Sequence, residues 1–130
     1  MLELAFYMVL EQKGKGGIKL PEKVTLSYLT HEALLFVASR CVPSELLERY
    51  KSPNMQVFRN VGNECFIRMP RMPDFDGFLH LDINEDLVYA VMYEVLFLLN
   101  KEPFYRNLAL DIIAQYNANE GKDIDDVRNN

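Results

Sequence analysis

The sequence of 130 residues is 49% hydrophobic and 25% charged, which is typical of one globular domain that buries a core of its own. Its two cysteines, Cys41 and Cys65, lie far apart in the sequence, so we expect reduced thiols and no disulfide framework. The net charge of −5 is concentrated in residues 82–130, where ten acidic side chains outnumber four basic ones, and this argues against a primary surface for duplex nucleic acid.

Three helices are predicted in the first 50 residues of the chain. Residues 2–12 have apolar side chains at helical spacing, and the glycine-rich residues 13–17 predict an exposed, mobile loop. The opening residues lack the positively charged start and the cleavage site of a signal peptide, so we expect the protein to stay where it is made. Residues 44–50, which follow Pro43, predict a short helix. Before them, a longer helix is predicted over about residues 25–41, with a stripe made by Leu26, Leu29, Ala33, Phe36, Val37 and Arg40.

A β-hairpin is predicted over about residues 55–69. Its two strand-like runs, 55–61 and 64–69, are separated by Gly62-Asn63, a dipeptide typical of a two-residue type II′ turn. An isolated hairpin is marginally stable in water, so we expect this one to pack on the helices or to gain further strands. Its free edges are candidates for pairing with a partner's strand.

The loop over residues 70–81 combines two prolines with large apolar side chains. The prolines keep the residues before them extended, and the apolar side chains are Met72, Phe75 and Phe78. Two interpretations remain open for this loop. It either folds back onto the core of its own chain or forms an arm that lies on a neighbouring molecule.

The chain is organised around a helix predicted over about residues 83–99. Every position from 87 to 99 except Glu94 is apolar or aromatic, so the helix has no polar face for water and must be covered on all sides. Asp82 and Glu85 have the spacing of an N-cap and its reciprocal carboxylate. The apolar run is shorter than the roughly 20 residues that span a bilayer. Glu94 is expected to face a subunit boundary or to pair with Arg40, Arg59, Arg68 or Arg106.

The last predicted helix covers about residues 103–117, with Pro103 in its first turn. Residues 118–130 are polar and acidic and predict a tail that is disordered unless a partner orders it. The expected fold class is therefore α+β and mainly α, a helical bundle around the central helix with one hairpin, in a single domain over residues 1–117. The apolar stripe of the last helix is expected to contain Phe104, Tyr105, Leu108, Ala109, Ile112, Ile113 and Tyr116.

The sequence predicts no catalytic, metal or cofactor site. His31 and His80 are not at ligand spacing from each other or from either cysteine. Residues 13–17 lack the Gly-Lys-Ser/Thr ending of a phosphate-binding loop. One group of side chains could act as an acid–base set, and it consists of His80, Asp74, Asp76 and Asp82. Because aspartates are common in solvated loops and at helix caps, we interpret this group as structural.

The order of the elements resembles small virion proteins of tailed bacteriophages. In their head-to-tail connector, adaptor and ring families, a strand that ends like Ile67-Arg68-Met69-Pro70 is followed by an acidic-capped helix of the form Leu-x-x-Ala-Val-x-Tyr, here Leu87 to Tyr93. The resemblance covers about residues 55–116 and is closest to the ring proteins of crAss-like phages, although the chain is shorter than the larger tail tubular proteins.

This resemblance implies a non-enzymatic structural protein of the virion neck or tail, made in the host cytoplasm. It implies a head-to-tail homo-oligomeric ring between the portal and neighbouring tail or ring proteins, with DNA passing nearby without sequence-specific binding, and no membrane. The alternative is a small phage-encoded enzyme or regulatory interaction module that acts as a monomer or dimer. The residues expected at the interface are Met72, Phe75, Phe78, Glu94, Arg68 and Arg71.

Overall fold

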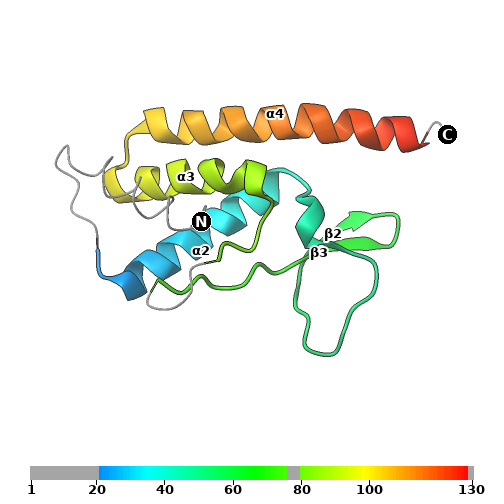
Figure 1. Cartoon of the computed structure of the whole chain (residues 1–130), viewed down its shortest axis with the longest axis horizontal. Coiled ribbons are helices and arrows are strands. Elements are labelled where there is room, and N and C mark those ends of the chain that lie inside the picture. The colour runs from blue at the N-terminus through cyan, green and yellow to red at the C-terminus, as the bar shows by residue number, and fades with distance from the viewer. Residues whose placement is uncertain (1–20, 76–79, 129–130) are drawn as a thin grey trace.

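The computed structural model describes residues 21–75 and 80–128, with side chains described up to residue 119. This part of the chain is mainly helical with a small antiparallel sheet, which confirms the predicted fold class (Figure 1). The helix predicted over residues 2–12 and the loop at 13–17 lie outside the described residues. The elements in chain order are α2 (Lys23–Arg40), the 3-10 turn η2 (Ser44–Leu46), β1 (Leu47–Glu48), β2 (Val57–Gly62), β3 (Cys65–Arg68), the 3-10 turn η3 (Glu85–Leu87), α3 (Val88–Asn100) and α4 (Pro103–Arg128).

Helix α3 lies between α2 and α4, as expected for the central apolar helix (Figure 1). It turns into α4 at Lys101, which has a left-handed φ of 62° and donates its backbone N–H to the Phe97 carbonyl. The cover is nearly complete, but Tyr89 is 45% exposed, so the expectation that every side of the helix is covered was too strong. The buried residues of α3 are Val88, Ala90, Val91, Met92, Glu94, Val95 and Leu96.

Helix α2 buries a face that is rotated from the predicted stripe. Arg40 is exposed and Phe36 is only half-buried. Two hydroxyl residues are buried in their place because each donates to the carbonyl four residues earlier, Ser27 to Lys23 at 3.0 Å and Thr30 to Leu26 at 2.7 Å. The buried face contains Leu26, Ser27, Thr30, Ala33, Leu34, Val37 and Ala38.

Helix α4 begins at Pro103 as predicted but does not end at Asn117. It continues to Arg128, so the prediction of a disordered segment from residue 118 was wrong for the backbone of this segment. No proline interrupts the sequence between these positions, and most of its residues are tolerated in a helix. Of the predicted stripe, Phe104 is 62% exposed, while the buried members are Ala109, Ile113 and Tyr116.

The sheet has three strands in the order β1-β3-β2, which agrees with the expectation that the hairpin packs on the helices or gains further strands, although the position of the added strand was not predicted. Leu47 pairs with Ile67, and the helix predicted over residues 44–50 is limited to the single turn η2. The hairpin turn lies one residue later than predicted. Gly62 pairs with Cys65, and Asn63 and Glu64 form the two-residue loop with positive φ angles of 54° and 62°. Two positive φ angles are typical of a type I′ turn, so the type II′ prediction was wrong.

The segment that precedes α3 also differs from the prediction. Asp82 is not an N-cap, because η3 precedes α3 and neither element has a side-chain cap. The Asp82 carboxylate is instead buried against arginines from another part of the chain. Within the described ranges, no helix combines the length and the apolar character that a membrane crossing needs.

Candidate functional site

The buried Asp82 carboxylate joins the end of strand β3 to the segment before α3. Arg68 donates to both of its oxygens, at 2.5 Å and 2.8 Å, and the Arg71 backbone N–H donates to Oδ2 at 2.9 Å. Only 5% of the Asp82 side chain is exposed, compared with 20% of Arg68 and 75% of Arg71. A two-pronged arginine contact fixes orientation as well as charge, so this pair sets how the chain leaves the sheet.

The arginine contacts determine the ionisation of Asp82. Burial by itself raises the pKa of this carboxyl, but the hydrogen bonds from Arg68 and from the Arg71 backbone outweigh burial and hold the pKa below its usual value. Asp82 is therefore charged throughout the neutral range. Its role is to hold Arg68 and Arg71 at the edge of the surface described next.

A groove of about 580 Å³ lies between α2, the loop that leads into β2 and the segment that leaves β3. His31 closes one side, where its Nε2–H donates to the Pro70 carbonyl at 2.9 Å. The groove is lined by three methionines, of which Met72 is 46% exposed. Methionine side chains adapt to irregular partners and recur at binding surfaces. The lining residues are His31, Ser52, Asn54, Met55, Gln56, Arg68, Met69, Pro70, Arg71 and Met72.

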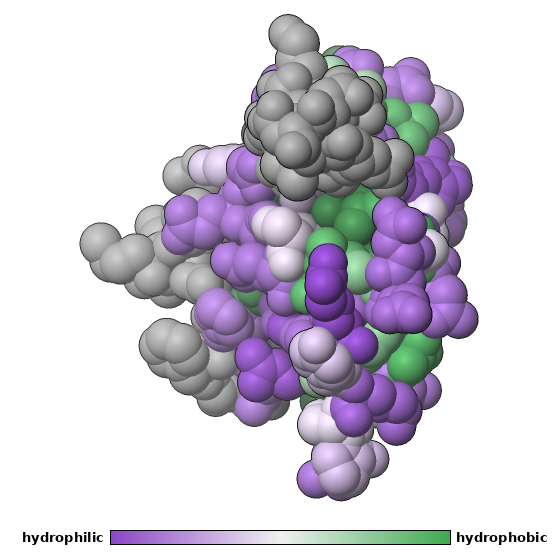
Figure 2. All heavy atoms as spheres, turned by 90° about the vertical axis from the view of Figure 1, so that its right-hand side faces the viewer, coloured by the Kyte–Doolittle hydropathy of each residue, from purple (hydrophilic) through white to green (hydrophobic). Residues whose placement is uncertain are grey.

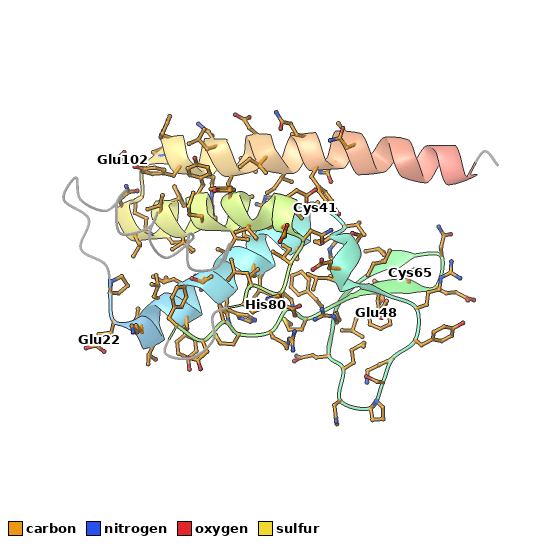
Figure 3. All side chains as sticks on the ribbon, viewed as in Figure 1. Glu22, Cys41, Glu48, Cys65, His80 and Glu102 are labelled. Atoms are coloured by element: carbon orange, nitrogen blue, oxygen red, sulfur yellow. The ribbon has the colours of Figure 1, made fainter. Side chains whose placement is uncertain are left out.

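The groove belongs to a basic part of the chain, residues 49–72, which we call the basic lobe. The lobe contains five Lys or Arg side chains and a single acid, Glu64. Figure 2 looks at the sheet-bearing end of the molecule and shows it as mainly hydrophilic, with hydrophobic side chains between the polar ones. Beside the lobe, Glu48 reaches Arg68 at 3.6 Å, and Figure 3 labels Glu48 next to the strands. The five cations are Arg49, Lys51, Arg59, Arg68 and Arg71.

Two of these cations are committed to internal contacts. Arg68 holds Asp82, and Arg59 donates to the carbonyls of Ala38 and Cys41 at the end of α2. The sequence offered Arg59 only as a candidate partner for Glu94, and nothing in its surroundings indicated that it would cap a helix. The Arg71 side chain is 75% exposed, and its Nε lies 3.6 Å from Asp82 Oδ2.

Glu94 pairs with Arg106, one of the four arginines proposed for it. Arg106 donates to both carboxylate oxygens, at 3.1 Å and 2.6 Å, and its guanidinium lies over Phe36 and Phe97 at 4.6 Å and 4.1 Å from the ring centres. Glu94 is 1% exposed. The pair therefore ties α3 to α4 inside one chain, and its position does not support the predicted place for Glu94 at a subunit boundary.

The structure brings together only part of the predicted interface. Arg68, Arg71 and Met72 line the groove. Phe75 is 7% exposed and belongs to the core of its own chain, where its backbone N–H reaches the Ser27 hydroxyl at 3.4 Å. The loop therefore folds back at this point, and the prediction that Phe75 lies on a neighbour was wrong. Phe78 lies outside the described residues.

The described residues contain no group of three or more His, Cys, Asp or Glu side chains that could hold a metal ion. In the set proposed around His80, Asp76 falls outside the described ranges and Asp82 is occupied by arginines. The thiol of Cys41 is buried at the end of α2, which raises its pKa to about 12. Figure 3 labels Cys41 there and Cys65 in the hairpin.

The groove and the basic lobe are therefore the candidate site, and its chemistry is that of a contact surface for an acidic, partly apolar partner. The chain matches no protein-family model, no curated protein and no solved structure.

Proposed function

We propose that this chain is a non-enzymatic structural protein that forms a head-to-tail ring in the neck or tail of a tailed bacteriophage. In this role it is made in the host cytoplasm and assembles between the portal and neighbouring tail or ring proteins. DNA passes through the ring without sequence-specific contacts. The proposal rests first on the resemblance of residues 55–116 to the phage connector and ring families.

The observation that carries the proposal is the presence of a packed helical body beside an exposed groove. The two buried carboxylates, Asp82 and Glu94, are both held by arginines that join elements of the chain. The groove, by contrast, presents Met72 and Arg71 to solvent. A subunit of a ring needs this combination of a stable body and a surface that is completed by another molecule.

The energy of such a contact is repeated at every junction of a ring. Burying an apolar side chain of the size of Met72 contributes roughly 1.5–3 kcal/mol. Association also costs several kcal/mol of translational and rotational freedom. Subunits that associate only weakly in isolation are therefore compatible with a ring that is completed on a portal template.

The test is incorporation into particles. The full chain is produced together with the portal and tail proteins of a phage that encodes it, and the particles are examined by electron microscopy and mass spectrometry. We expect the unmodified chain to enter particles as a closed ring, and Met72→Asp to enter at a much lower level. Val24→Asp is the matched control, because Val24 is 60% exposed in the first turn of α2, away from the groove.

The proposal is wrong if the unmodified chain never enters particles. If Met72→Asp enters as well as Val24→Asp, the groove is not part of the ring contact. A chain that remains a monomer or dimer beside these proteins, and that binds a cellular protein or turns over a substrate, supports the alternative of a small enzyme or regulatory module.

A further inference from the structure

Helix α4 is long enough to reach well past its neighbour α3. It has 26 residues, whereas its antiparallel neighbour α3 has 13, and it starts directly after α3 ends. At 1.5 Å per residue, the difference is about 20 Å. Tyr116 and Asn117 still hold α4 to the end of α2 and the segment after it, through the carbonyls of Val42 and Arg40. Figure 1 shows the helix running on beyond α3.

The sequence of this last part of α4 offers few apolar side chains for packing on the body. Residues 118–128 contain four acids, two bases and a glycine, and Ile124 and Val127 are the large apolar side chains. Isolated helices shorter than about 12–15 residues are marginal in water, and most helical stability in proteins comes from packing an apolar face. The acids are Glu120, Asp123, Asp125 and Asp126.

The groove has the complementary character. It is lined by methionines that accept apolar side chains, and no Asp or Glu is among the described residues that line it. Arg71, one of the lining residues, is mostly exposed, and the basic lobe adds Arg49 and Lys51, which are exposed but do not line the groove. Opposite potentials on two surfaces steer their association and fix their register.

We propose that the acidic end of α4 from one copy binds the methionine-lined groove of the next copy. The inference rests on the proposed ring function and specifies its subunit contact. The two surfaces come from different parts of the chain, so the contact is head-to-tail, and repetition closes a ring if the rotation allows it. Ile124 and Val127 supply the apolar side chains for the groove, and the aspartates pair with the cations around it.

Charge reversal on the full chain tests this contact. The groove variant is Arg71→Glu, and the helix variant is Asp125→Arg with Asp126→Arg. Self-association is measured by sedimentation velocity and native mass spectrometry at matched concentrations. We expect each variant alone to associate roughly tenfold more weakly or worse, because like charges then meet at every junction.

Mixing the groove variant with the helix variant tests the contact more specifically. In an equal mixture, the acidic groove of one variant meets the basic helix end of the other, and the basic groove meets the acidic helix end, so both contacts of an alternating ring are restored. A chain that carries all three substitutions is likewise expected to associate by itself. Lys101→Glu and Asp111→Arg are the controls, since both residues are exposed on the helical body.

The inference is overturned if the mixture does not recover, if the controls weaken association as much as the variants, or if the unmodified chain is a monomer at every concentration. Self-association that no variant changes also overturns it, while the ring function stands if particles still incorporate the chain. If Arg71→Glu associates normally but no longer assembles with the portal or tail proteins, the groove binds one of those proteins instead. Failure of the unmodified chain to enter particles is the separate outcome that removes the proposed function.

Discussion

At the scale of single residues, two buried acids are held in the same way. Asp82 and Glu94 each receive a two-pronged contact from an arginine that lies more than ten positions away in the sequence. Such a pair contributes little net stability relative to an apolar pair, but removing one partner leaves a charge without its counter-ion. The main effect of these acids is therefore to determine which elements of the chain pack together, and they add little to the stability of that packing.

Replacement of Asp82 by Asn is expected to destabilise the fold by about 3 kcal/mol, because Arg68 loses its counter-ion at a site that is mostly removed from water. Urea denaturation at pH 7 measures the change. Asp111→Asn, at an exposed position of α4, is the matched control and should stay within about 0.5 kcal/mol of the unmodified chain. Equal loss in both variants would show that the ion pair is not the cause.

The same substitution predicts a pH dependence. The pKa of Asp82 is lower in the folded chain than in the unfolded chain, so its contribution is complete above the usual aspartate range and is lost as pH falls through the folded pKa. The stability difference between the unmodified chain and Asp82→Asn should therefore be constant from pH 6 to 8 and shrink below about pH 4. A difference that grows on acidification contradicts this assignment.

The thiols should differ in reactivity. Burial raises the pKa of Cys41 to about 12, and the side chain is 4% exposed, so almost no reactive thiolate is present at neutral pH. We expect iodoacetamide to modify Cys65 in the folded protein and Cys41 only after unfolding in urea. Intact mass before and after denaturation measures this, and the replacement of Cys65 by Ser isolates the signal of Cys41. Rapid modification of Cys41 in the folded chain would contradict the buried position.

At the scale of elements, the hairpin turn contains measurable backbone strain. Glu64 has a φ of 62°, a conformation that costs a side chain roughly 1–2 kcal/mol and glycine almost nothing. Glu64→Gly is therefore expected to stabilise the fold by about 0.5–1 kcal/mol after the greater freedom of the unfolded chain is subtracted.

Gly62→Ala is the matched substitution that is expected to change stability in the opposite direction. Gly62 has a φ of 90°, and an added Cβ meets no atom within 4 Å, so the expected loss of about 1 kcal/mol comes from backbone strain alone. Thermal denaturation of both variants separates the two effects. The same sign for both substitutions would mean that the loop has a different conformation in solution.

The helices were predictable because their signals are local. The apolar run of α3 and Pro103 at the start of α4 are properties of neighbouring residues, and the structure agrees with both. The hairpin was found for the same reason, but its turn was misplaced because Asn63 and Glu64 adopt positive φ as well as Gly62 does. Asparagine tolerates this conformation, which moves the turn by one residue.

The errors fall where distant residues decide the outcome. Asp82 has the spacing of an N-cap, but Arg68, fourteen positions earlier, takes its carboxylate instead. Strand β1 has two residues and exists because Leu47 meets Ile67 across the sheet, which no local pattern reveals. For the same reason, the sequence could place Arg68, Arg71 and Met72 in one candidate set but could not show that His31 closes their groove.

At the scale of the whole molecule, the body and its projecting parts differ in how they are stabilised. Helices α2, α3 and α4 pack together to form the body, and Phe75 is part of its core. The loop that was expected to reach a neighbour therefore packs on its own chain up to this residue. The basic lobe and the far end of α4 are the regions that we propose for contacts with other molecules. They carry opposite charge excess and come from different thirds of the chain.

This difference predicts two classes of backbone exchange within a single helix. Residues 104–117 of α4 contain Ala109, Ile113 and Tyr116, which are buried against the body, so their amides should exchange slowly. Residues 118–128 offer Ile124 and Val127 as their large apolar side chains, so in the free chain their helix should open readily and their amides should exchange faster.

If the end of α4 binds the next copy, assembly should remove the difference in amide exchange between the two parts of the helix. Hydrogen exchange followed by mass spectrometry on free chain and on purified particles measures protection in peptides that end on either side of Asn117. We expect protection of residues 118–128 to rise at least about tenfold on assembly, since each tenfold step corresponds to about 1.4 kcal/mol of binding. Peptides from residues 104–117 are the internal control and should change little, because the body already protects them. Strong and equal protection of both halves in the free chain would mean that the end of α4 is stable without a partner, and the partner-dependent order argued for this helix would then be wrong.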